Sequence, residues 1–122
     1  MATAGATKVK GMDASYYTVK DMARATKFYN ELLGMEPTTT FGESVVEYTF
    51  PSGETFGLFQ SENHAPRGGI LFAVDDLHKA VAEHKTRGVK FRNDGDVMDS
   101  PVCHMAFGED SEGNDFILHQ RK

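Results

Sequence analysis

The chain has one cysteine, no tryptophan and no long apolar run. A lone cysteine, Cys103, excludes an intrachain disulfide, and no stretch is long and apolar enough to span a bilayer. The first residues lack the apolar stretch of a secretory signal, so we expect a flexible leader over residues 1–11 and a cytoplasmic location. Without tryptophan, the best side chain for stacking on a cation is missing.

Basic residues are scarce in the body of the chain. Residues 21–119 hold 8 of the 13 basic residues but 17 of the 18 acidic ones. Nucleic-acid binding needs a basic face, so this acidity argues against a nucleic-acid partner. It would suit a cationic ligand, although acidity that only keeps the protein soluble is the more ordinary explanation.

A helical pattern occurs twice, and each copy starts after an aspartate and stops at a glycine. The first copy lies between Asp21 and Gly34, and the second lies between Asp76 and Gly88. An aspartate accepts hydrogen bonds from the free N–H groups of a first helical turn, and glycine readily adopts the left-handed conformation that ends a helix. Strand-like runs and glycine-containing turns follow both copies. A repeated unit of this kind indicates a ligand site where the two copies meet.

These segments resemble the vicinal oxygen chelate superfamily, which includes glyoxalase I, the bleomycin-resistance proteins and the extradiol dioxygenases. The resemblance extends over about residues 12–120 and is carried by residues 17–22, 27–35, 72–77, 86–91 and 107–119. It implies an α+β fold in which two βαβββ modules form a half-open barrel around a cavity, often within a homodimer. The superfamily hosts many chemistries, so the fold alone does not identify a reaction.

The 122 residues therefore predict one domain over residues 12–122, with modules at about 12–60 and 69–120 and a linker at 61–68. We expect helices at residues 22–33 and 77–87, the first with Met22, Thr26, Tyr29 and Leu33 on its packed face. The expected strands are 12–19, 35–41, 44–50 and 54–60, then 69–74, 89–92, 103–108 and 114–120. A long loop is expected at residues 93–101.

Two three-residue turns, 51–53 and 111–113, fix which strand residues face the cavity. They place Glu47 opposite Gly57 and Met105 opposite His119. Another turn length would push Glu47 into the apolar layer under the helices, at a high desolvation cost. The predicted ligand-binding residues are Tyr16, Glu47, Phe59, Leu71, Cys103, Met105, Phe107, Ile117 and His119.

The resemblance also implies metal ligands at four positions, which correspond here to Ala14, Gly57, Gly69 and Ile117. None of these residues has a side chain that binds a divalent metal, and an alignment shifted by one residue gives no better set. We therefore expect no metal and no other cofactor. Of the remaining candidates, only His119 and Glu47, with Cys103, could converge, and they would do so from distant strands. His84 is expected at the edge of the core, and His104 is expected to point away from the cavity.

Two classes of function remain. The first is metal-free binding of a planar or cationic small molecule, as in the bleomycin-resistance branch. The second is a lyase or isomerase in which Glu47 or His119 is the general base and Tyr16 is the acid or the oxyanion partner. A metal-dependent glyoxalase comes third. We favour binding over catalysis by a small margin.

Overall fold

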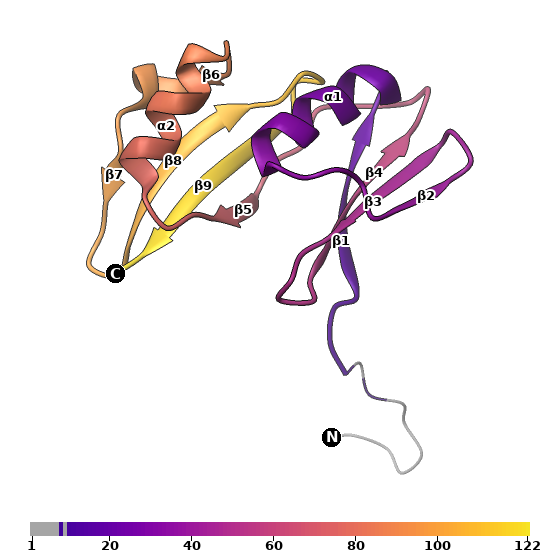
Figure 1. Ribbon diagram of the computed structural model, residues 1–122, viewed down its shortest axis with the longest axis horizontal. Coiled ribbons are helices and arrows are strands. Elements are labelled where there is room, and N and C mark those ends of the chain that lie inside the picture. Colours follow the sequence, from indigo (N-terminus) through magenta and orange to yellow (C-terminus); the bar gives the residue numbers. More distant parts are fainter. Residues whose placement is uncertain (1–7, 9) are drawn as a thin grey trace.

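The first module is a four-stranded sheet with one helix on its packed face (Figure 1). The computed structural model describes residues 8 and 10–122, so the predicted leader lies mostly outside the described residues. The sheet has the order β1-β4-β3-β2, in which β1 and β4 are parallel and the other pairs are antiparallel. Its elements are β1 (Ala14–Val19), α1 (Met22–Leu33), β2 (Thr39–Phe41), β3 (Val45–Thr49) and β4 (Thr55–Gln60).

The second module repeats this arrangement with the sheet order β5-β9-β8-β6. Its elements are β5 (Ile70–Ala73), α2 (Leu77–Thr86), β6 (Lys90–Phe91), β7 (Met98–Asp99), β8 (Cys103–Glu109) and β9 (Asp115–Arg121). The prediction of a loop at 93–101 was wrong in part, because a 3-10 turn (Arg92–Gly95) and β7 lie in this region. A two-residue strand leaves no periodicity to detect, and β7 exists only through its pairing with β8.

Both helices begin as the sequence predicts. The side chain of Asp21 accepts a hydrogen bond from the Arg24 amide at 3.0 Å, and that of Asp76 accepts one from the Lys79 amide at 3.1 Å. Gly34 ends α1 with φ of +69°, in the left-handed region. The helix–strand repeat confirms the α+β class and the two βαβββ modules, and the two sheets stay separate without closing a barrel.

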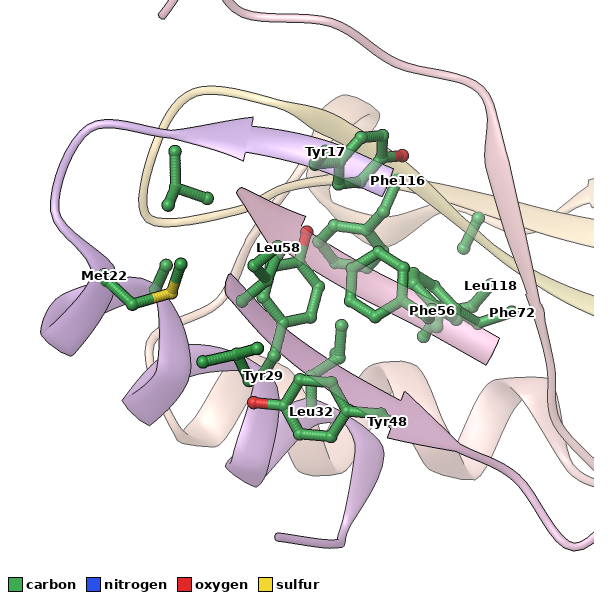
Figure 2. Packing of buried hydrophobic residues seen from close by; sticks show 14 of the residues in the cluster. Tyr17, Met22, Tyr29, Leu32, Tyr48, Phe56, Leu58, Phe72, Phe116 and Leu118 are labelled. Atoms are coloured by element: carbon green, nitrogen blue, oxygen red, sulfur yellow. The ribbon is translucent and has the colours of Figure 1, made fainter. Parts of the chain in front are cut away.

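Helix α1 packs between the two modules, and its buried face differs from the predicted one. Met22 and Tyr29 are buried as expected, but Ala25 and Leu32 replace Thr26 and Leu33 as the other fully buried positions. Figure 2 shows Tyr29 among aromatic rings from both modules. Its ring centroid lies 4.9 Å from that of Phe56 on β4 and 6.3 Å from that of Phe72 on β5. The stripe is rotated because α1 covers a second sheet in addition to its own.

Each sheet thus has one packed face and one open face. On β1, Tyr17 and Val19 point into the core, whereas Tyr16 points to the open side. Of the large apolar side chains that are exposed in the described residues, most lie on these two open faces: Tyr16, Phe41, Phe59, Leu71 and Met98. In this part of the chain, no helix is long and apolar enough to cross a membrane.

Candidate functional site

Three neighbouring strands place Tyr16, Gly57 and Glu47 in a row on the open face of the first sheet. Gly57 on β4 stands opposite Tyr16 on β1 and opposite Glu47 on β3. The turn at Pro51-Ser52-Gly53, with Gly53 at φ of +102°, produces the predicted register. The hydroxyl of Tyr16 donates a hydrogen bond to Oε2 of Glu47, which confirms the prediction that Glu47 lies within reach of Tyr16.

The electrostatics of this pair favour a neutral phenol beside a carboxylate. The hydrogen bond to Glu47 is the main cause that raises the pKa of Tyr16, followed by partial burial and the charge of Glu47. Tyr16 is therefore a hydrogen-bond donor at neutral pH. Phe59 lies on the same face and is 49% exposed, so the pair has an open aromatic surface beside it.

The open face of the second sheet carries the other predicted residues. Met105 on β8 pairs with His119 on β9, and Phe107 pairs with Ile117, as the turn at residues 111–113 predicts. Leu71 on β5 pairs with Ile117 and is 48% exposed. Cys103 belongs to the same face, but it is buried and its Sγ lies 3.2 Å from Oγ of Ser100. Ser100 therefore covers Cys103, which makes it the member of the predicted set least accessible to a ligand.

The two open faces do not enclose a common cavity within one chain. Tyr16 is 42% exposed, nearly as much as Phe59 and Leu71. Glu47 bonds to Tyr16 on its own sheet, whereas His119 stands beside Met105 and Ala73 on the other sheet. The predicted convergence of Glu47, His119 and Cys103 is not found. Over residues 8 and 10–122, no three His, Cys, Asp or Glu side chains are grouped closely enough to hold a metal ion.

The residues at the four positions implied for a metal do not fit one. Ala14, Gly57, Gly69 and Ile117 supply no side-chain oxygen, nitrogen or sulfur. At Gly57 the space is also taken, because a Cβ added there would lie 2.6 Å from Cζ of Tyr16. The ring of Tyr16 thus lies over the backbone where a ligand side chain would have to stand.

The two largest hollows found in the described residues lie mainly outside the open faces. One, of about 810 Å³, lies at the start of α1 and is lined by Lys20, Asp21, Arg24, Glu43 and Gln60 among others. The second, of about 630 Å³, lies between the modules and is lined mostly by apolar residues, which include Leu33, Phe50 and Val74, together with a few polar ones such as Glu54. It reaches the edge of the open face at Leu71 and Ala73. Glu47 and His119 line neither hollow, so the volume of a hollow does not identify the predicted site residues.

The hairpin turn between β8 and β9 carries a buried polar network that sequence reasoning missed. Its members Asp110, Glu112 and Asn114 are buried, although the sequence suggested an ordinary acidic turn. The carboxylate of Glu112 accepts hydrogen bonds from the backbone amides of Lys20 and Asp21, both at 2.9 Å, and from Nε of Arg24 at 2.7 Å.

The other two members of this turn network also reach the first module. Asp110 accepts a hydrogen bond from the hydroxyl of Tyr29 at 2.6 Å, and Asn114 donates one to the carbonyl of Thr18 at 3.0 Å. His64 of the linker joins them, with one ring nitrogen 2.7 Å from Oγ1 of Thr18 and the other 2.9 Å from the carbonyl oxygen of Glu112. Partners so distant in sequence leave no local signal, so no motif could have revealed this network.

The histidines outside the site lie where the sequence suggested. His84 is buried against the core, and His104 is on the packed side of β8, where it pairs with Asp99 at 3.0 Å. Nδ1 of His84 has no hydrogen-bond partner among the described residues.

A family model covers nearly all of this architecture. Residues 11–117 match the model of the Glyoxalase/Bleomycin resistance protein/Dioxygenase superfamily. The chain belongs to this superfamily. The match confirms the resemblance seen in the sequence, and it leaves open which of the superfamily's chemistries applies.

Relatives within the superfamily have different activities in their names. A probable chloroplastic lactoylglutathione lyase of Arabidopsis thaliana is 29% identical over 123 residues, which cover 86% of this chain and 34% of that protein. The chain therefore spans about a third of the length of this relative.

Solved structures of the superfamily show the same fold at low identity. The antibiotic-binding protein TnmS3 of Streptomyces sp. CB03234 has a TM-score of 0.76 at 19% identity, with 96% of this chain and 100% of that chain covered. A lactoylglutathione lyase of Agrobacterium tumefaciens has a TM-score of 0.75 at 14% identity, with 93% and 96% covered.

Proposed function

We propose that this protein is a metal-free small-molecule binding protein that holds a planar or cationic compound on the open face of the first sheet. The observation that carries the proposal is the Glu47 carboxylate, which stands on an open, largely apolar face beside Tyr16 and Phe59. Its Oε2 accepts from Tyr16, and Oε1, which has no hydrogen-bond partner among the described residues, can accept from an N–H group of a ligand. Aromatic rings at the same face suit a flat molecule.

A second copy of the chain would complete the site. Both open faces expose large apolar side chains that a stable protein ordinarily covers, among them Phe59 and Leu71. The open face of the first sheet carries the acid Glu47, whereas that of the second carries His119 and Arg121 at one end of the β8–β9 pair and the acids Glu109 and Asp115 at the other. The end with His119 and Arg121 favours a homodimer in which it faces the first sheet of the other copy. Leu71, Met105, Phe107, Ile117 and His119 would then form the opposite wall.

Metal-free binding is supported by the side chains at the four implied positions and by the Tyr16 ring over Gly57. The antibiotic-binding protein among the structural neighbours shows that the fold can serve binding. A cytoplasmic location is part of the same proposal, supported by a lone cysteine that is buried and unpaired.

The proposal is tested with proflavine, a planar cation with N–H donors, and with acridine, which is flat but uncharged at neutral pH. We expect Glu47→Gln to weaken proflavine binding by roughly 1–3 kcal/mol, the loss of a charge-assisted hydrogen bond, and to leave acridine binding unchanged. Isothermal titration measures both. Glu43→Gln, an exposed acid in the β2–β3 turn, is the matched control. Equal proflavine affinity in wild type and Glu47→Gln, with a large fall in melting temperature, would show that Glu47 is structural.

The homodimer is tested by sedimentation. We expect the wild type to sediment as a dimer, and Leu71→Glu, which places a second acid opposite the face of Glu47, to shift it towards the monomer. A wild type that stays monomeric at all accessible concentrations would contradict the dimer. The role of Glu47 in ligand binding would still be decided by the isothermal titration with proflavine.

Catalysis is the second candidate, favoured by the direct hydrogen bond between a carboxylate and a phenol that could exchange a proton with a substrate. Incubation with lactoylglutathione, the compound in the names of two relatives, tests it. Turnover that is lost in Glu47→Gln would replace binding by catalysis as the function of the same face.

A further inference from the structure

Gly57 on β4 is the position over which the side chain of Tyr16 on β1 reaches Glu47 on β3. Tyr16 on β1 and Glu47 on β3 both pair with Gly57 on β4, so β4 separates the phenol from the carboxylate. A side chain at position 57 would stand between them on the same face. The ring of Tyr16 lies where that side chain would be, since an added Cβ would come within 2.6 Å of Cζ and 2.7 Å of Cδ2 of the ring.

These distances exclude even the smallest side chain while the ring stays in place. Real Cβ atoms essentially never approach another atom below 3.0 Å, so the ring would have to move. The ring can move, because Tyr16 is 42% exposed and is not locked by the core. The backbone of Gly57 is also not in the left-handed region, so an alanine there is not strained in itself.

We propose that Gly57 is the specificity-determining residue of the binding face, because it lets the ring of Tyr16 lie flat across β4 and hold Glu47. This inference rests on the proposed function and deepens it. The ring forms an aromatic floor, and its hydroxyl engages one carboxylate oxygen and leaves the other for the ligand. The ligand class that fits is a flat molecule with a single cationic N–H group at its edge. Any side chain at position 57 displaces the floor and releases Glu47.

Tyr16 supplies a readout that needs no ligand. It is the exposed member of the four tyrosines, whereas burial raises the pKa of Tyr17 to about 12 and raises those of Tyr29 and Tyr48 as well. Tyrosinate absorbance therefore reports Tyr16 first as the pH rises. The hydrogen bond to Glu47 raises the pKa of Tyr16, so losing that bond moves this first step towards lower pH.

The experiment compares wild type with Gly57→Ala, Tyr16→Ala and the double variant. We expect Gly57→Ala to move the first tyrosine titration towards its ordinary pH and to weaken proflavine binding about tenfold. In the Tyr16→Ala background, Gly57→Ala should leave proflavine affinity unchanged, because its effect acts through Tyr16. Melting curves confirm that each variant is folded. Tyr16→Phe keeps the ring and removes the hydroxyl, so it distinguishes the contribution of the ring to binding from that of the hydrogen bond.

An unchanged tyrosine titration in Gly57→Ala would overturn the inference, whatever happens to proflavine. A shifted titration with unchanged proflavine affinity would overturn the claim that Gly57 determines specificity, and Glu47→Gln would still decide the proposed function. If the wild type binds neither proflavine nor acridine, the proposed ligand class is wrong, and the titration alone decides whether Gly57 positions Tyr16.

Discussion

Glu112 is expected to be the acid on which folding stability depends most, and Glu112→Gln is the perturbation that tests this. Its side chain is fully buried, with 0% exposed, and it joins the hairpin of the second module to the β1–α1 junction of the first. Burial alone would raise its pKa. The hydrogen bonds from Arg24, from the amides of Asp21 and Lys20 and from Ser111 outweigh burial and lower the pKa to about 2.

The magnitude follows from this pKa. A drop from 4.5 to about 2 corresponds to about 3 kcal/mol of preference for the ionised form in the folded state. For a carboxylate with a lowered pKa, this stability is present above the unfolded pKa near 4.5 and is lost as the pH falls towards about 2. A glutamine cannot ionise and presents an amide N–H group to donors. We expect Glu112→Gln to lower the free energy of unfolding by about 3 kcal/mol at neutral pH.

The assay is urea unfolding at neutral pH and at several acid pH values, with Glu62→Gln as the control because Glu62 is an exposed acid of the linker. The difference in the free energy of unfolding between wild type and Glu112→Gln should shrink as the pH falls below 4.5, because the unfolded wild type then takes up a proton that the folded state binds only near pH 2. A double-mutant cycle with Arg24→Ala measures the contribution of the Arg24–Glu112 ion pair to the free energy of unfolding. A loss below about 1 kcal/mol, or a difference that does not depend on pH, would refute the reasoning.

Three further predictions concern other parts of the chain. Burial and the charge of Arg87 lower the pKa of His84, so the free energy of unfolding should fall as the pH drops below 6.5. In urea unfolding, His84→Gln should reduce this pH dependence, whereas His78→Gln, at an exposed histidine, should not. Asp21→Ala and Asp76→Ala should each cost about 1 kcal/mol by removing a helix cap, whereas the neighbouring Asp75→Ala should be nearly neutral. Protein purified without added metal should contain no stoichiometric divalent ion by elemental analysis, and a chelator should not change its melting temperature; a fall would show a metal site that the four implied positions do not supply.

The elements that the sequence predicted best are those decided by local chemistry. The caps at Asp21 and Asp76 depend on residues three positions apart, and the hairpin registers depend on short turns that end in glycine. The contact of Tyr16 with Glu47 followed from strand alternation and the cost of burying a carboxylate. Both arguments need only the residues within one module.

Features that join the modules could not be predicted in this way. The buried face of α1 depends on Phe72 and Phe116 of the second module, and a helical pattern does not say how many sheets a helix covers. The burial of Glu112 depends on amides about ninety residues earlier in the chain. The prediction of a common cavity was wrong for the same reason. Strand alternation shows which face of its sheet a residue lies on, but it does not show how one sheet is placed relative to the other.

The position of Tyr29 also determines when this chain can fold during synthesis. Its ring packs against Phe72, and its hydroxyl bonds to Asp110, while its neighbour Phe28 packs against Phe116. The ribosome makes α1 before it makes these partners, so Phe28 and Tyr29 lack their contacts with the second module until almost the whole chain has been synthesised. Contacts of such large sequence separation make folding slow and late. We therefore expect an N-terminal fragment that ends in the linker to expose these side chains and to aggregate more readily than the whole chain.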